Sequence, residues 1–281
     1  MNKNSILSDN NKGNLYILLT AFLWSTGGLL IKYIPMNALA INGSRSVIAF
    51  LCFCIYRKSI KIKINKTIVL AALSLVLTNI LYVAANKLTT AANAIVLQYT
   101  APIFVLLWDC IYRKQMPKKR QCLIVAMAFC GMILFFCDQL EGGYLLGNIL
   151  AILAGLCFSG VFFINSLPSS SSEDSSMLAF VIASLVAIPF LGEVRALDGT
   201  GWIALLILGI FQLALAYVLF AKGSKLTSPV SASLIGLLEA ILNPLWVFLA
   251  FQEKIGRFAL VGALVLMGAV VLNIIYSKKK E

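Results

Sequence analysis

Few ionisable side chains lie inside the long apolar runs of this sequence, so each can be weighed by the chemistry it could perform. Glu239 is the most informative, because it lies about eleven residues into an apolar run, roughly 16 Å along a helix and near the middle of a bilayer core of about 30 Å. A carboxyl group at that depth must be paired, protonated or in contact with water in a cavity. It could bind a cationic group or carry a proton, and it could equally be a structural anchor hydrogen-bonded to neighbouring helices.

For two further charged residues within apolar runs, the sequence favours structural roles. Arg45 lies about seven residues into its run, roughly 10 Å from the boundary, where a long cationic side chain can extend back to the interface. It could instead pair with an acidic ligand group or a buried carboxylate. Asp109 precedes Arg113 by four residues, which is the spacing of an ion pair within one helix.

Neutral polar and aromatic side chains in the apolar runs suggest the lining of a binding pocket. Lipid offers these groups no hydrogen-bond partners, so they are expected to point into the protein. Hydrogen bonding between helices is the alternative role for each of them. A wider group shares this placement: Ser25, Ser159, Asn165, Gln212, Tyr217 and Asn243. The predicted substrate-binding set, with Glu239 as a possible coupling residue, is Trp24, Asn79, Tyr82, Gln98, Tyr99 and Glu239.

Several other chemistries lack the residues that they need. The sequence contains no His, which removes Ser-His and Cys-His nucleophilic pairs and every His-ligated metal site. No G-x-x-x-x-G-K-[ST] motif occurs, so ATP is not expected to drive this chain directly. We therefore predict no catalytic residue, no metal site and no cofactor, and we do not expect an enzyme. The 7 Cys residues lie in or beside apolar runs and are predicted to be buried apolar side chains.

The elements that must position these residues are membrane-spanning helices. Of the 281 residues, 60% are hydrophobic and 12% are charged, and the mean hydropathy is +0.94, an apolar excess beyond that of soluble domains. The net charge of +12 would otherwise suggest a nucleic-acid partner. A soluble nucleic-acid-binding protein could not keep this much apolar surface from aggregating, so we expect a lipid bilayer and no nucleic acid.

Ten apolar runs can cross a bilayer core as helices, which takes about 20 residues each. The seventh run is short and contains Pro189, so it is the least typical of a membrane-spanning helix. Because backbone groups in lipid must be hydrogen-bonded within the segment, the predicted fold is an all-α membrane protein with ten transmembrane helices. The predicted spans are Leu15–Ile34, Ala38–Tyr56, Thr67–Ala85, Thr90–Tyr112, Gln121–Cys137, Leu145–Ser166, Met177–Leu191, Trp202–Ala221, Ser228–Ala250 and Phe258–Tyr276.

The Lys and Arg residues between these spans indicate the orientation, because cytoplasmic loops are enriched in them. With the N-terminus inside, the outer segments hold only Lys32, Lys87, Arg195, Lys254 and Arg257. We therefore predict a multi-pass cell-membrane protein with both termini in the cytoplasm. The cations of the inner segments are Lys3, Lys12, Arg57, Lys58, Lys61, Lys63, Lys66, Arg113, Lys114, Lys118, Lys119, Arg120, Lys222, Lys225, Lys278, Lys279 and Lys280.

The chain also resembles itself, which predicts two repeats of five spans at 1–138 and 139–281. Because five is odd, the second repeat must cross the membrane in the opposite sense to the first. Inverted repeats are typical of secondary transporters, although a duplicated unit could also be only a stable scaffold. The matches are Gly13-Asn14-Leu15 with Gly147-Asn148-Ile149 and Ser25 with Ser159 at an offset of 134, then Lys87-Leu88-Thr89-Thr90 with Lys225-Leu226-Thr227-Ser228 and Trp108 with Trp246 at an offset of 138.

Several motifs in these repeats are similar to those of the EamA-type transporters of the drug/metabolite transporter superfamily. They are Leu23-Trp24-Ser25-Thr26-Gly27-Gly28, Leu97-Gln98-Tyr99-Thr100-Ala101-Pro102, Leu238-Glu239-Ala240-Ile241-Leu242-Asn243-Pro244 and Glu253-Lys254. The chain departs from the family pattern at Gln115, where the first half would have Glu, and at Ala240, where Pro often follows Glu. The resemblance covers nearly the whole chain and implies ten helices around a central cavity, with transport of a small metabolite, often export.

The prediction for function is a secondary transporter, with export as the expected direction, that moves a small organic metabolite by alternating access at a site near the membrane midplane. A carboxylate with aromatic neighbours favours an amino acid or an amine as substrate, and a proton or an exchanged solute is the candidate coupling partner. A passive channel or facilitator is the main alternative, and an integral-membrane enzyme is a weaker one. We further expect Pro102 and Pro244 to kink spans four and nine.

Overall fold

The computed structural model describes residues 3–252 and 256–278. Within these ranges the chain is helical and contains no strand, which confirms the all-α prediction. The elements are α1 (Lys3–Ser25), α2 (Gly27–Ile31), α3 (Ala38–Arg57), α4 (Lys66–Leu88), α5 (Ala91–Gln98), α6 (Ala101–Arg113), α7 (Lys119–Phe136), η1 (Cys137–Gln139), α8 (Leu145–Ser166), α9 (Ser172–Val186), η2 (Ile188–Ala196), α10 (Gly199–Ile207), η3 (Leu208–Leu215), α11 (Ala216–Leu226), α12 (Pro229–Gly236), α13 (Leu238–Phe251) and α14 (Ala259–Lys278).

Nine helical segments of the described chain are long and apolar enough to cross a membrane, and a bent pair makes a tenth. That pair is the predicted seventh span, in which α9 and η2 meet at an angle of 53°. Pro189 lies in the first turn of η2, where its ring interrupts the α-helical hydrogen bonds. The helix also begins at Ser172, earlier than predicted, because the Ser171 side chain caps it by accepting a hydrogen bond from the Asp174 backbone N–H.

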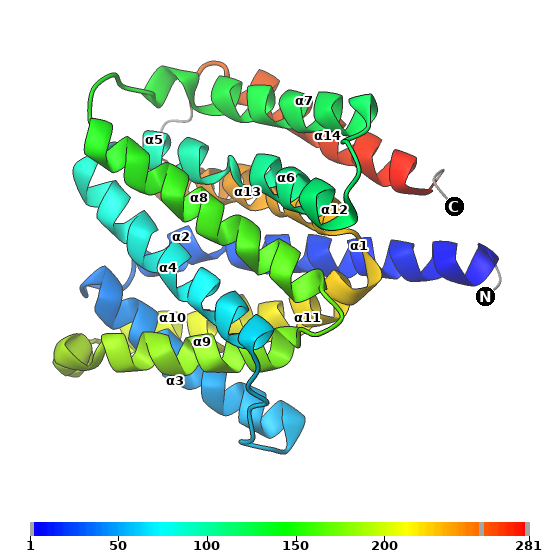
Figure 1. Cartoon of the computed structure of the whole chain (residues 1–281). Helices are drawn as coiled ribbons and strands as arrows, with labels where there is room; N and C mark the ends of the chain where they lie inside the picture. Colours follow the sequence, from blue (N-terminus) through cyan, green and yellow to red (C-terminus); the bar gives the residue numbers. More distant parts are fainter. Residues whose placement is uncertain (1–2, 253–255, 279–281) are drawn as a thin grey trace.

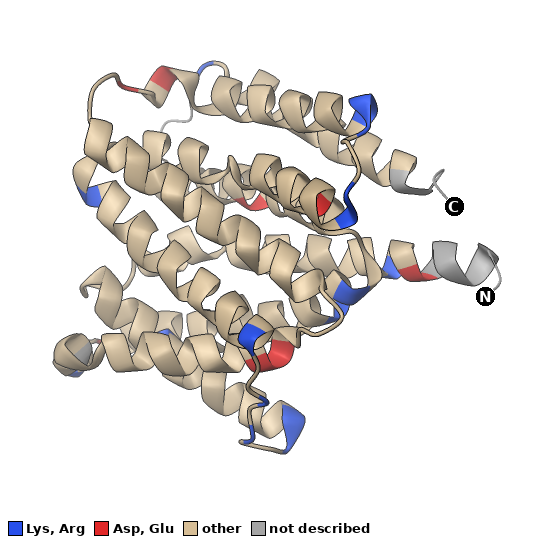
Figure 2. Ribbon diagram, in the orientation of Figure 1, with Lys and Arg blue, Asp and Glu red and all other residues tan. Residues whose placement is uncertain are grey.

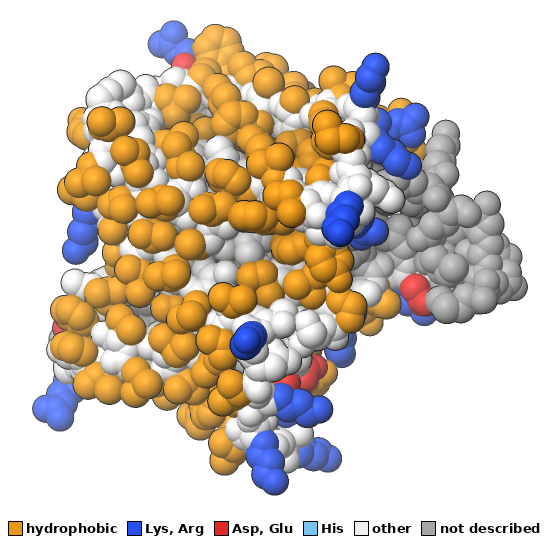
Figure 3. All heavy atoms as spheres, viewed as in Figure 1, with side chains coloured by type: hydrophobic (Ala, Val, Ile, Leu, Met, Phe, Trp, Pro, Cys, Tyr) orange, Lys and Arg blue, Asp and Glu red, His pale blue; other side chains and the backbone are white. Residues whose placement is uncertain are grey.

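The surface of the molecule suits a bilayer. Apolar side chains cover its middle, and charged groups gather toward the two ends (Figure 3). Among the described residues Cys122 and Cys130 are exposed, and the other five cysteines are partly buried, with Cys52, Cys54 and Cys110 packed against the hydrophobic core. The prediction that the cysteines are buried is therefore wrong for Cys122 and Cys130, because a thiol is apolar enough to face lipid as well as a protein core.

Both chain ends lie at the same end of the helix bundle (Figure 1), and many of the Lys and Arg residues cluster there (Figure 2). The Asp109–Arg113 ion pair forms within α6 as predicted, with Nε and Oδ1 2.8 Å apart. The Glu253-Lys254 motif lies outside the described residues, as do Lys279 and Lys280.

The first helix of each repeat packs against the other repeat. Helix α1 begins at the end that holds the termini and packs on α11, α12 and α13, whereas α8 begins at the opposite end and packs on α4, α5 and α6 (Figure 1). The two halves therefore run in opposite senses, as predicted, and are interlocked. A Cβ added at Gly147 would lie 2.5 Å from the Leu88 carbonyl, and one at Gly13 would lie 2.8 Å from the equivalent carbonyl carbon of Leu226. Glycine at both positions lets the crossing helices approach.

Two pairs of reciprocal hydrogen bonds join the halves at positions that the repeat relates. The Trp246 indole N–H donates to Ser25 Oγ at 2.9 Å, and the Trp108 indole N–H donates to Ser159 Oγ at 3.0 Å. The same symmetry holds at the helix ends. Thr227 Oγ1 donates to Asn14 Oδ1 at 2.6 Å, and Thr89 Oγ1 donates to Asn148 Oδ1 at 2.8 Å.

Spans four and nine are each broken near the middle of their length. The break between α5 and α6 is at Tyr99 and Thr100, and the break between α12 and α13 is at Leu237, which is related to Tyr99 by the offset of 138. Pro102 follows the first break closely, in agreement with the predicted kink. Pro244 lies inside α13, which continues through it, so the break in span nine is at Leu237 and not at this proline, and the kink at Pro244 stays a prediction.

Candidate functional site

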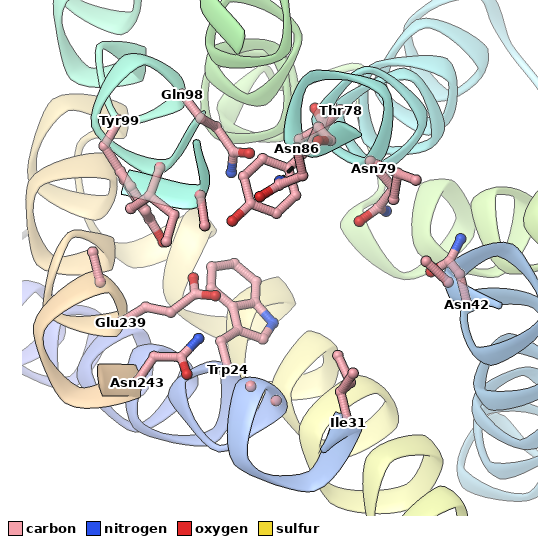
Figure 4. A pocket seen from close by; sticks show the side chains of 18 of the residues that line it. Trp24, Ile31, Asn42, Thr78, Asn79, Asn86, Gln98, Tyr99, Glu239 and Asn243 are labelled. Atoms are coloured by element: carbon pink, nitrogen blue, oxygen red, sulfur yellow. Dashed lines mark hydrogen bonds between the residues drawn. The ribbon is translucent and has the colours of Figure 1, made fainter. Parts of the chain in front are cut away.

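A cavity of about 700 Å³ lies where the broken helices of the two halves meet. Its wall is built mainly from α1, α2, α3, α4, α5, α13 and η3, with further residues from α7, α8 and α11, so both repeats contribute to it (Figure 4). The structure brings all of the predicted substrate-binding residues to this wall: Trp24, Asn79, Tyr82, Gln98, Tyr99 and Glu239. Their contact with a substrate remains a prediction.

Glu239 lies in the first turn of α13, directly after the break at Leu237. The N-terminus of a helix carries partial positive charge, so this position favours a carboxylate. The side chain points into the cavity toward Tyr99 (Figure 4), and the two side chains share a hydrogen bond. No Lys or Arg of the described chain lies within the 4.0 Å of an ion pair. The carboxylate is therefore available to a cationic group in the cavity.

Two buried polar atoms at the cavity have no hydrogen-bond partner in the described part of the chain. They are the indole Nε1 of Trp24, a donor, and the amide Oε1 of Gln98, an acceptor. The Trp24 ring is held in place by Tyr217 and Phe220, with ring centroids 5.3 and 5.7 Å away. Because a buried polar atom without a partner is costly, each of the two would be stabilised by a hydrogen bond that a small rearrangement of the wall opened to a water or a ligand.

Asn79 and Tyr82 share one face of α4, as their spacing predicts. Asn79 Nδ2 donates to the Leu75 carbonyl at 3.1 Å, which leaves its carbonyl oxygen free to accept a hydrogen bond from the cavity. Asn86, one turn further along, likewise donates to the Tyr82 carbonyl at 2.9 Å. Helix α4 therefore presents a row of polar groups opposite Glu239 (Figure 4).

Arg45 also lines the cavity, although the sequence favoured a structural role for it. Its guanidinium does not extend to the interface and donates instead to Asn42 Oδ1 and Gln212 Oε1, at 2.9 and 3.1 Å. The position of Arg45 inside an apolar run was the available signal. Its orientation toward the cavity could not be predicted, because it depends on contacts with a helix far along the sequence.

Gln212 lies in η3, a π-helical segment within the eighth span. A π-helix has i→i+5 hydrogen bonds, so side chains five residues apart lie near one another. Gln212 and Tyr217 have this spacing, and both line the cavity. The Nε2 atom of Gln212 also reaches the Trp24 carbonyl at 3.5 Å, close to the break between α1 and α2.

The cavity reaches one end of the bundle and is closed toward the other. Its wall includes Lys32, Lys87 and Gln139, which lie at helix ends away from the termini. Toward the termini an aromatic cluster fills the space: Trp24, Phe158, Phe162, Tyr217 and Phe220.

Beyond the aromatic cluster, an ion pair ties the two halves together at the end that holds the termini. Arg57 Nη1 lies 2.7 Å from Asp174 Oδ1, and the Asp174 side chain is 3% exposed. Within the second half, at the same end, the Lys225 ammonium donates to the Leu167 and Ser170 carbonyls, at 3.2 and 2.8 Å. The cavity is therefore accessible from the end opposite the termini.

Glu239 is the sole acidic side chain among the described residues that line the cavity. A metal ion there would have one carboxylate and neutral oxygen atoms as ligands, so the wall suits an organic cation better than a tightly coordinated metal. The arrangement can bind a small polar molecule by charge, hydrogen bonds and aromatic contact.

Comparison with known proteins identifies one family and a solved structure with the same fold. The profile of the EamA-like transporter family matches residues 11–137 and 145–275, once for each repeat. An uncharacterized transporter of Archaeoglobus fulgidus is 23% identical over 264 residues, which cover 92% of this chain and 95% of that protein. The uncharacterized transporter YwfM of Bacillus subtilis is 25% identical over 287 residues, covering 96% and 97%. A solved crystal structure has the same fold, with a TM-score of 0.80 at 15% identity, over 96% of this chain and 99% of that one.

Proposed function

This chain belongs to the EamA-like transporter family, and on that premise we propose that it is a secondary transporter of a small organic metabolite. The observation that carries this proposal is the central cavity, which is built by both repeats and is accessible from one end only. A carrier needs a binding site whose access changes from one side of the membrane to the other. Interlocked inverted repeats allow this change, because the closed end and the open end are formed by equivalent helices of the two halves.

The proposed substrate carries an amino or other cationic group, as an amino acid or an amine does. Glu239 supplies a carboxylate without an ion-pair partner among the described residues, and Tyr99, Tyr82 and Trp24 supply aromatic groups around the same space. Aromatic faces attract cations electrostatically, and a low-dielectric wall strengthens that attraction. The family resemblance favours export, and Glu239 is the proposed site of any coupling to protons.

The proposed location is the cell membrane, with both termini in the cytoplasm. This orientation rests on the excess of Lys and Arg at the end of the molecule where the termini lie. The cavity would then be accessible from outside the cell in the state that the structure describes. An exporter in this state has the site positioned for release.

A passive channel or facilitator is the alternative. The aromatic cluster around Trp24 and the Arg57–Asp174 ion pair argue against it, because they block a continuous aqueous path through the described structure. An enzyme is less well supported, since the described residues of the cavity wall include one carboxylate and no nucleophile–base pair.

Exchange in proteoliposomes tests the proposal. The purified full-length chain is reconstituted, the vesicles are loaded with a pool of the twenty amino acids and simple monoamines, and uptake of each labelled compound is measured. We expect saturable uptake of at least one compound, accelerated by the same compound inside. Linear uptake without trans-acceleration by any compound, or by a metabolite extract, would contradict a carrier and favour a channel.

A further inference from the structure

We infer that the cavity selects zwitterionic solutes, with Glu239 binding the ammonium group and Arg45 binding the carboxylate. The inference rests on the proposed function, because it names the substrate class of the same cavity. It assigns Arg45 a specificity-determining role. Arg45 would distinguish amino acids from amines, which the carboxylate of Glu239 alone does not do.

The guanidinium of Arg45 has donors to spare. Its Nη1 donates to Gln212 Oε1 at 3.1 Å, its Nη2 donates to Asn42 Oδ1 at 2.9 Å, and its Nε reaches the same oxygen at 3.3 Å. A guanidinium carries five N–H groups, so two remain for another acceptor. Both present partners are neutral amides, which orient the group without neutralising its charge. A planar guanidinium held in this way is suited to a carboxylate.

The two opposite charges face one cavity without forming an ion pair. Arg45 and Glu239 both line the wall and are near enough to interact electrostatically, but they are further apart than the 4.0 Å of a salt bridge. An uncompensated charge at membrane depth is costly. A zwitterion placed between them would compensate both charges at once, whereas an amine would compensate Glu239 and leave Arg45 without a counter-ion.

The repeat shows that the scaffold does not need either charge. The position equivalent to Glu239 in the first half is Ala101, at the offset of 138. The positions that match Arg45 in the second half are Ala179 at the offset of 134 and Ala183 at the offset of 138. Helices of equivalent place in the fold therefore form with alanine at these positions. The two charges are additions to the symmetric framework, and both are at the cavity.

The mouth of the cavity favours solutes with a carboxylate. Lys32 and Lys87 lie on its rim, and both residues are exposed. The Lys32 ammonium lies 5.2 Å from the centre of the Phe251 ring. Cationic groups at the rim of a low-dielectric cleft raise the local concentration of anionic groups and lower that of simple amines.

Binding to matched compounds tests the inference in the purified full-length chain. The probes are leucine, its decarboxylated analogue isoamylamine and its deaminated analogue 4-methylpentanoate, with phenylalanine, 2-phenylethylamine and 3-phenylpropanoate as a second series. A pool of the twenty amino acids is tested first, and any member that binds is then compared with its own two analogues. The measured quantity is the rise in the unfolding midpoint with ligand concentration, which gives an apparent Kd.

We expect an amino acid to bind at least tenfold more tightly than either analogue. Arg45→Gln should weaken amino-acid binding at least tenfold and abolish the preference over the amine, while Glu239→Gln should abolish the preference over the carboxylic acid. Arg45→Lys, which keeps the charge without the planar donors, should lie between Arg45→Gln and the unsubstituted chain. Arg113→Gln is the matched control, because Arg113 is exposed and paired with Asp109.

The inference is overturned if an amine binds as tightly as its amino acid, since this comparison needs no variant. It is also overturned if folded Arg45→Gln retains the full preference. If no zwitterion binds but the vesicles still show trans-accelerated exchange of another metabolite, the inference fails and the proposed function stands. If no metabolite is exchanged at all, the proposed function itself fails.

Discussion

At the scale of single residues, the cavity concentrates groups that lipid could not satisfy. Glu239 has no ion-pair partner in the described chain, and one polar atom each of Trp24 and Gln98 has no hydrogen-bond partner there. A protein interior normally pairs such groups, because leaving them unpaired costs about 1–3 kcal/mol each. A hydrogen bond from a water or a ligand would lower this cost for the Trp24 and Gln98 atoms, and a cationic group would pair with Glu239.

The coupling role of Glu239 is tested by Glu239→Gln, which keeps the shape and removes the ionisable group. We expect an imposed pH gradient to drive uptake by the original chain and to have no effect on the variant, because the amide cannot carry a proton. Uptake is measured in proteoliposomes at several gradients. Asp109→Asn is the control, since Asp109 pairs with Arg113 outside the cavity. Unchanged pH dependence in a folded Glu239→Gln chain would rule out the coupling role.

The indole N–H of Trp24 is tested by Trp24→Phe, which preserves an aromatic ring among Tyr217 and Phe220. Losing one hydrogen bond to the substrate should raise the apparent KM by roughly fivefold, equivalent to about 1 kcal/mol. Trp202→Phe should leave KM unchanged, because Trp202 is 44% exposed and is not part of the cavity wall. Equal KM values for all three chains would show that the indole N–H does not contact the substrate.

The sequence allowed much of the site to be predicted at this scale, for a physical reason. Polar side chains in an apolar run must point inward, so Asn79, Tyr82 and Gln98 could be placed on a common wall without a structure. Arg45 could not be assigned in this way, because a long cationic side chain can either extend to the interface or turn inward. Its direction is set by Asn42 on the same helix together with Gln212, which is distant in the sequence.

At the scale of helices, close approach depends on glycine where the halves cross. Gly147→Ala would place a Cβ 2.5 Å from the Leu88 carbonyl, and this neighbour is backbone that cannot move aside. We expect a loss of about 1–3 kcal/mol in the free energy of unfolding, measured as a lower unfolding temperature in detergent. Gly142→Ala is the control, because nothing lies within 4 Å of the added Cβ. Equal stability of the two variants would contradict the tight crossing of α8 and α4.

The breaks within the helical spans could be predicted only in part from the sequence. Apolar runs located the spans, and Pro189 and Pro102 marked two of the irregular places correctly. Pro244 did not, since the break in span nine lies at Leu237, directly after Gly236. The π-helical turns of η3 also have no local signature in the sequence. Breaks of this kind are set by tertiary contacts and become visible only in the fold.

At the scale of the whole molecule, the two ends differ in how they hold the halves together. The end with the termini has the buried Arg57–Asp174 ion pair, at 2.7 Å, with Glu173 3.6 Å from the same guanidinium. At the other end of the same helices, the Glu193 carboxylate accepts a hydrogen bond from the Asn37 backbone N–H at 2.6 Å. An ion pair holding one end closed is consistent with a cavity that is accessible from the other.

Removing the ion pair should shift the balance between the two accessible states. We expect Asp174→Asn to lower the labelling rate of a cysteine placed at Asn86 by a membrane-impermeant maleimide, because the end with the termini opens more often. The exchanged pair Arg57→Asp with Asp174→Arg should recover much of the original rate. A labelling rate that is unaffected by Asp174→Asn would show that the ion pair has no part in holding this end closed.

The central claim is that the cavity is the path of the transported solute. It is tested most directly by Asn86→Cys in a chain whose 7 Cys residues have been replaced, since Asn86 lies on the cavity wall near its mouth. We predict that a membrane-impermeant methanethiosulfonate reagent reduces exchange to the level of protein-free vesicles, and that substrate slows the modification. The same reagent at Gly142→Cys, in a loop outside the cavity wall, should leave exchange intact. Complete modification of Asn86→Cys with an unchanged exchange rate would contradict the claim.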